Sequence, residues 1–108
     1  MADVKPRVRV PEVARKGEII EIKTLISHPM ESGQRADASG ARVPRDIIRK
    51  FSCTYNGAVV FEADWYPAIS ANPYLAFTTV ATESGVLAFT WLDDDGQAVV
   101  ATAPITVE

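Results

Sequence analysis

The Asn56-Gly57 pair is the feature that most constrains how this chain folds. A tight type I′ turn needs a positive φ at both central residues, and Asn-Gly adopts it readily. Runs of alternating apolar and polar residues flank the pair, 46–55 before it and 59–65 after it. Such alternation places the apolar side chains on one face of a strand. The sequence therefore predicts an antiparallel hairpin of two strands that turns at residues 56–57.

Five further segments have the composition of β-strands, namely residues 7–10, 18–27, 74–80, 86–92 and 98–107. Turn signals such as His28-Pro29 and Asp95-Gly96 follow some of them. Proline has no N–H for a strand ladder, and Asp-Gly favours a turn. About seven short strands without helical periodicity predict an all-β fold, an antiparallel immunoglobulin-like β-sandwich, with a small barrel as the alternative.

The predicted core combines an aliphatic strand face with an aromatic cluster. The inward face of segment 18–27 is expected to consist of Ile20, Ile22, Thr24 and Ile26. The inward face of segment 59–65 is expected to consist of Val59, Phe61, Ala63 and Trp65. In the aromatic cluster, Leu87, Phe89 and Trp91 are expected to face Phe51, Phe61 and Trp65 across the sandwich. These side chains would supply most of the buried apolar surface.

Length and composition indicate one globular domain, residues 1–108. A chain of 108 residues can bury enough surface to fold around one core without disulfides or metal. No apolar run approaches the ~20 residues of a membrane-spanning helix, so we expect no membrane interaction. The N-terminal residues have neither the apolar stretch of a secretory signal nor a twin-arginine pair, which by itself predicts a cytoplasmic protein.

Charge is distributed unevenly along the chain. Residues 1–50 carry all eleven Lys and Arg with seven Asp and Glu, a net charge of +4. Residues 51–108 carry seven Asp and Glu and no Lys or Arg, a net charge of −7. Aromatic residues lie mostly in the acidic half, away from the cations with which they would bind nucleic acid, so we expect no nucleic-acid partner. In a sandwich the two halves interleave, so the asymmetry can average out over the surface. The alternative is that the basic half helps dock an acidic surface on the partner or on a redox enzyme.

The sequence offers little for catalysis or metal binding. It has one histidine, His28, and one cysteine, Cys53, which lies in phase with the apolar residues of its strand and is expected to be buried and inert. A thiol or metal enzyme using Cys53 and His28 is the weaker alternative, because one His and one Cys cannot complete the usual zinc, copper or iron ligand sets. We therefore predict no enzyme activity, no catalytic or metal-binding residue and no cofactor.

Recognition of another protein is the remaining role. Residues 30–44, between the second and third predicted strands, form a long irregular segment rich in Gly, Ser, Ala and Arg, and such long loops are often functional. Met30, Arg35, Tyr66 and Tyr74 are of types enriched at protein interfaces, and we predict them as partner-binding residues.

Several motifs together resemble the SoxZ family, which is the Z subunit of the sulfur carrier SoxYZ. They are the run from Gly17 to Arg35, Val43-Pro44-Arg45, Asn56-Gly57, the segment Ser70 to Tyr74, and the segment Phe89 to Gly96. They occur in order over nearly the whole chain. The resemblance implies an immunoglobulin-like sandwich that forms a tight heterodimer with a SoxY-like subunit. In that pair, a cysteine near the glycine-rich C-terminal end of SoxY carries the sulfur intermediates of thiosulfate oxidation.

The same resemblance implies a supporting role without catalysis. The pair presents its intermediates to a c-type cytochrome, a sulfate-releasing hydrolase and a sulfane dehydrogenase, which are the implied transient partners. The last residues here hold neither cysteine nor glycine, so this chain is expected to support the carrier arm. The resemblance also implies a periplasmic location by co-export with a signal-bearing partner, in place of the cytoplasmic expectation. A stand-alone β-sandwich binding domain is the alternative.

Overall fold

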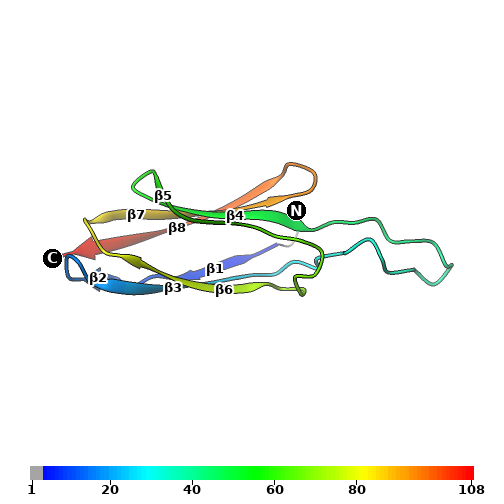
Figure 1. The fold of residues 1–108 in the computed structure, drawn as a ribbon, viewed down its shortest axis with the longest axis horizontal. Helices are drawn as coiled ribbons and strands as arrows, with labels where there is room; N and C mark the ends of the chain where they lie inside the picture. Colours follow the sequence, from blue (N-terminus) through cyan, green and yellow to red (C-terminus); the bar gives the residue numbers. More distant parts are fainter. Residues whose placement is uncertain (1–3) are drawn as a thin grey trace.

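A computed structural model describes residues 4–108, which form two packed β-sheets (Figure 1). The strands are β1 Pro6–Arg9, β2 Val13–Ala14, β3 Ile19–Ile26, β4 Ile48–Tyr55, β5 Ala58–Asp64, β6 Tyr74–Val80, β7 Gly85–Asp93 and β8 Ala98–Val107. The described residues contain no helix that could cross a membrane. All of the predicted strands are present within about two residues of their expected ends, as the clear alternation in the sequence led us to expect.

The strands divide into a three-stranded sheet in the order β1-β3-β6 and a five-stranded sheet in the order β2-β8-β7-β4-β5. Neighbouring strands are antiparallel, apart from β2, which runs parallel to the end of β8 with Val13 opposite Thr106. The predicted antiparallel immunoglobulin-like sandwich is therefore confirmed. Strand β2 was not predicted, because two residues are too few to show an alternating pattern.

The Asn56-Gly57 turn adopts the predicted conformation, with φ of 48° at Asn56 and 86° at Gly57. The Asn56 side chain also acts beyond the turn, because its Oδ1 accepts a hydrogen bond of 2.9 Å from the main-chain N–H of Val86. A Cβ atom on Gly85 would lie 1.8 Å from this Oδ1. The hairpin of β4 and β5 thus fixes the start of β7, and any side chain at position 85 would displace the Asn56 amide from this hydrogen bond.

Two β-bulges alter the predicted faces of the hairpin strands. Between β4 and β5, Cys53 pairs with Phe61 but Thr54 pairs with Val59, so one extra residue of β5 is left unpaired. The prediction that Val59 points inward is wrong, since its side chain is 59% exposed while Val60 is half-buried. A second bulge between Ile48 and Lys50 lets Arg49 leave the inner face.

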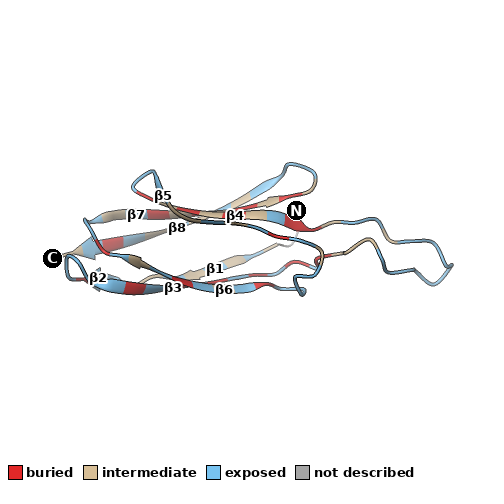
Figure 2. Cartoon of the chain, in the orientation of Figure 1, coloured by how far each residue is buried: buried red, intermediate tan, exposed pale blue. Residues whose placement is uncertain are grey.

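The core lies between the sheets, and buried residues occur at intervals along the strands of both (Figure 2). Ile20, Ile22, Thr24 and Ile26 are buried on β3, as predicted. The predicted aromatic arrangement is wrong in one respect, because Phe51 and Trp91 pair on adjacent strands of one sheet. Their ring centroids are 5.3 Å apart. The opposite sheet contributes the β3 isoleucines and Phe77, whose ring stacks on Phe61 at 4.5 Å.

The long segment expected to be irregular is an ordered extension of the sandwich. We call residues 31–45 the arm, which projects beyond the ends of the sheets in Figure 1. Antiparallel bridges join Glu31 to Asp46 and Ala36 to Arg42 across its two limbs. At its tip, Asp37 Oδ1 accepts hydrogen bonds from the N–H groups of Ser39 and Ala41. These contacts hold the two limbs of the arm together.

Candidate partner-binding surfaces

His28 lies at the base of the arm and has a structural role. Its side chain is buried, and Nδ1 accepts a 2.9 Å hydrogen bond from the N–H of Met30. The neutral ring must then carry its proton on Nε2, which lies 4.0 Å from Asp46 Oδ1. Burial lowers the pKa of His28, and the negative charge of Asp46 offsets part of that effect. A protonated Nε2 cannot bind a metal, so the ring serves to cap the chain after β3.

Met30 also belongs to the core. It has a φ of 50°, which turns its side chain inward, and it is only 6% exposed. Its Sδ lies 3.3 Å from the main-chain N of Ile48 at the start of β4. The structure thus places this predicted partner-binding residue beneath the surface, and no contact in the structure tests the partner role itself.

Cys53 is fully buried in β4, as predicted, and burial raises the pKa of its thiol to about 11. Met30, two residues after His28, lies beside Ile48 at the start of β4. Cys53 lies five residues further along β4, roughly 16 Å from Ile48 at ~3.3 Å per residue. His28 and Cys53 therefore cannot form a nucleophilic pair. This separation argues against a thiol or metal enzyme that uses both residues.

Three carboxylates meet near the base of the arm. Oxygen atoms of Asp46, Asp93 and Asp95 lie within 4.8 Å of one another. Asp93 Oδ1 already accepts hydrogen bonds of 2.9 Å from the N–H of Asp95 and 2.8 Å from that of Gln97. This is the ordinary capping role of an aspartate in a hairpin turn. Asp93 thus stabilises the turn between β7 and β8.

Ion pairs hold the arm in its extended position. Arg45 binds Asp94 through two hydrogen bonds of 2.9 and 3.0 Å, which joins the arm to the turn after β7 and lowers the pKa of Asp94. Arg35, a predicted partner-binding residue, forms a similar pair with Glu31 at 2.6 and 3.2 Å, which lowers the pKa of Glu31. Both Arg35 and Arg45 remain exposed on the arm.

Three strands of the five-stranded sheet, β4, β7 and β8, share an outer surface without charge. We call it the uncharged face, and it consists of Ser52 and Thr54 of β4, Val86, Ala88, Thr90 and Leu92 of β7, and Ala98, Val100, Thr102 and Pro104 of β8. The register sets these residues side by side, with Thr90 between Ser52 and Val100. Among the described residues, charge borders this face along β4 and β5, where Lys50 contacts Glu62 at 3.7 Å. Depletion of charge is typical of the centre of a protein interface.

Sequence reasoning did not single out the uncharged face. Its signal was present, because every second residue of segments 86–92 and 98–104 is small or uncharged. That pattern becomes a surface only once the pairing of β4, β7 and β8 is known. The predicted residues do not form one site, since Arg35 lies on the arm, Tyr66 follows β5 and Tyr74 lies on β6. Both tyrosines are exposed, by 64% and 60% respectively.

Known structures share this fold at low sequence identity. Superoxide reductase (neelaredoxin) from Ignicoccus hospitalis has a TM-score of 0.71 at 20% identity, covering 95% of this chain and 80% of that one. The sulfur carrier protein SoxY from Chlorobium limicola f thiosulfatophilum has a TM-score of 0.65 at 14% identity, covering 95% and 78%. A CARDB domain from Pyrococcus furiosus in complex with di-metal ions has a TM-score of 0.58 at 17% identity, covering 98% and 88%. At these identities the likeness shows the fold alone.

Comparison at the level of sequence is more specific. No curated protein matches the chain. A family model does match it, that of the sulphur oxidation protein SoxZ, over residues 8–104. The match spans all of the strands apart from their outermost residues, and it confirms the resemblance carried by the motifs. This protein therefore belongs to the SoxZ family.

Proposed function

We propose that this chain is the non-catalytic partner subunit of a sulfur carrier in thiosulfate oxidation. It forms a heterodimer with a SoxY-like chain, whose C-terminal cysteine carries the sulfur intermediates. Membership of the SoxZ family supports the assignment to sulfur oxidation. The observation that carries the proposed partner role is the uncharged face, a broad sheet surface that the described part of the chain leaves open.

The dimensions of the uncharged face suit a stable pair. Strands β8, β7 and β4 lie side by side, which gives a width of ~14 Å at ~4.8 Å per strand. The nine residues of β7 span ~30 Å at ~3.3 Å per residue. The resulting area of ~430 Å², before side-chain relief is counted, is about half of the ~800 Å² that each partner buries in an interface of standard size, so this face would form the centre of such an interface. We infer that the SoxY-like chain packs on this face.

The buried positions of His28 and Cys53 support a role without chemistry of its own. A thiol with a pKa of about 11 stays protonated near neutral pH, and a protonated thiol neither attacks nor carries sulfur efficiently. The carrying cysteine of the complex is then the partner's. This chain holds the partner in place and leaves the partner's sulfur-bearing C-terminal segment free to reach other proteins.

The proposal extends to compartment and further partners. We propose a periplasmic location reached by export together with the SoxY-like chain, and transient encounters with the c-type cytochrome, the sulfate-releasing hydrolase and the sulfane dehydrogenase of the pathway. Cell fractionation with and without the signal of the SoxY-like chain tests the location. Periplasmic recovery of this chain should require that signal.

The experiment that tests the subunit role is co-expression with the SoxY-like chain of the same organism. Native mass spectrometry should show a one-to-one complex, and intact mass after incubation with the pathway enzymes and thiosulfate should show sulfur adducts on the partner alone. If this chain remains a lone monomer in the presence of that partner, it is instead a stand-alone binding domain. Sulfur adducts on this chain would contradict the non-catalytic role.

A further inference from the structure

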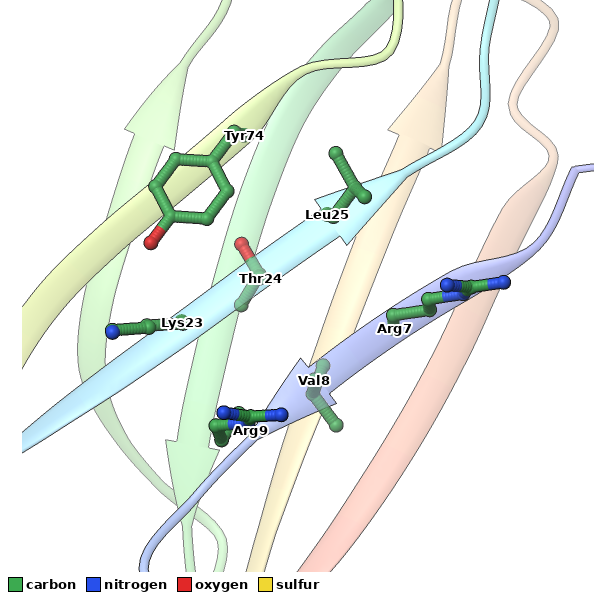
Figure 3. A pocket seen from close by; sticks show the side chains of 7 residues that line it. All are labelled: Arg7, Val8, Arg9, Lys23, Thr24, Leu25 and Tyr74. Atoms are coloured by element: carbon green, nitrogen blue, oxygen red, sulfur yellow. The ribbon is translucent and has the colours of Figure 1, made fainter.

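The outer side of the three-stranded sheet carries a groove opposite in character to the uncharged face. A hollow of about 430 Å³ lies over β1, β3 and β6, and Figure 3 shows the side chains that line it. A second hollow of about 310 Å³ adjoins it, because Arg7 and Leu25 line both. We call the combined surface the cationic groove and define it by Lys5, Arg7, Arg9, Lys23, Leu25 and Tyr74.

The groove is positively charged, and most of its Lys and Arg side chains form no ion pair with the described residues. Among the residues that the structure describes, no Asp or Glu lines either hollow. Lys23 contacts Glu21 at 3.4 Å, an exposed pair of little energetic weight. Within residues 4–108, Lys5, Arg7 and Arg9 form no ion pair. The four cations line a groove of a chain whose net charge is −3, so they are concentrated rather than spread.

The register places an apolar shelf beside these cations. Arg7 lies opposite Leu25, and Leu25 lies opposite Tyr74, so the three form one row across the sheet. Leu25 is 37% exposed and Tyr74 is 60% exposed. Arg9 lies in the next row, ~7 Å along β1, beside Lys23. Tyrosine and arginine together are the residue types that dominate binding energy in protein interfaces.

We propose that the cationic groove binds a short, extended acidic segment of another protein. Carboxylates of the segment pair with Arg7 and Arg9, since a guanidinium binds a carboxylate through two parallel hydrogen bonds. An apolar side chain of the segment packs on Leu25 and Tyr74. The distance from Lys5 to Arg9 along β1 is ~13 Å, which accommodates about four residues of extended chain.

Charge and extent favour a protein segment over nucleic acid. The cations cover only ~13 Å along β1, and Glu21 lies beyond Lys23 on the same strand. Phosphate tracking requires a longer basic track than this. The groove lies on the sheet opposite the uncharged face, so the proposal is independent of the heterodimer and of the sulfur pathway.

Cations on an edge strand such as β1 also prevent strands of other chains from pairing with that edge. The experiment must separate this effect from binding. The full chain, labelled with ¹⁵N, is titrated with an acidic peptide in which glutamates flank a phenylalanine and a leucine. Amide signals of Lys5, of residues 7–9 and 23–27 and of Tyr74 should shift, and the affinity should fall as salt is added. The triple variant Arg7→Gln, Arg9→Gln, Lys23→Gln should weaken binding at least about tenfold.

A matched triple variant controls for net charge. Arg15→Gln, Lys16→Gln and Arg42→Gln remove the same charge from exposed positions outside the groove and should leave the affinity within about twofold. If both triple variants weaken binding equally, or if the shifts map elsewhere, the proposal is overturned. Tyr74→Ala gives a second readout, because it should weaken binding even at high salt.

Two further probes decide the class of ligand. Sodium sulfate alone, at the same ionic strength, should not reproduce the peptide shifts. If it does, the groove is a small-anion site and the proposal fails. A single-stranded oligonucleotide of equal charge should bind more weakly than the peptide, and tighter binding would overturn the choice of a protein partner.

Discussion

Replacing Thr90 with arginine should separate binding from folding on the uncharged face. Thr90 lies on β7, the middle strand of the five-stranded sheet, between Ser52 and Val100. It points away from the core, so an arginine can extend into solvent in the free chain. Such surface changes alter the free energy of unfolding by about 0.5 kcal/mol or less.

The same arginine should be costly in the proposed complex. At the centre of a packed face, its charge would be buried without a partner, which costs roughly 3–5 kcal/mol. One power of ten in affinity corresponds to about 1.4 kcal/mol. The dissociation constant with the SoxY-like chain should therefore rise by about two to four powers of ten.

Isothermal titration calorimetry measures this change, and thermal melting of the free variant checks its fold. Thr78→Arg is the matched control, because Thr78 is an exposed strand threonine on the opposite sheet, in the pair of β3 and β6. It should leave the affinity unchanged. If Thr90→Arg binds like the wild type, or if Thr78→Arg weakens binding equally, the assignment of the uncharged face is refuted.

Three further predictions concern the core. Phe51→Ala should lower the free energy of unfolding by about 3–5 kcal/mol, because Phe51 is fully buried and contacts other aromatic rings. Val80→Ala, at a half-exposed site, should lower it by under about 1 kcal/mol. Equal losses for the two variants in urea unfolding would contradict the core described here. Because burial keeps the pKa of His28 below the 6.5 of a free histidine, the unfolded chain binds a proton first as the pH falls, so stability is full above pH 6.5 and declines below it. His28→Asn should reduce the change in the free energy of unfolding between pH 7 and pH 5. This range lies above the one in which the carboxylates of lowered pKa contribute. An unchanged dependence of stability on pH would refute the assignment. Cys53 should resist a thiol reagent at pH 8 in the native protein and react fully in denaturant, and rapid native labelling would contradict its burial.

The strands could be predicted from sequence because alternation and turn chemistry agree along this chain. The Asn56-Gly57 turn and the inward face of β3 follow directly from those two signals. The bulges could not be predicted, because a single inserted residue reverses the phase of a strand without changing its composition. Val59 is exposed for that reason.

The candidate site was less predictable than the fold. Residue types that favour interfaces also serve in cores, and Met30 shows this, since a positive φ at that residue turns it inward. Tyr74 is exposed in the cationic groove, but its neighbours Arg7 and Leu25 come from two other strands, so only the register brings them together. The uncharged face is likewise a property of paired strands rather than of any one segment.

The central claim is that the SoxY-like chain packs on the uncharged face. A photoreactive amino acid placed at position 90, and separately at position 78, tests it most directly in the purified complex. We predict that illumination cross-links the partner from position 90 and not from position 78. Cross-linking from position 78 alone would place the partner on the opposite sheet and contradict the account.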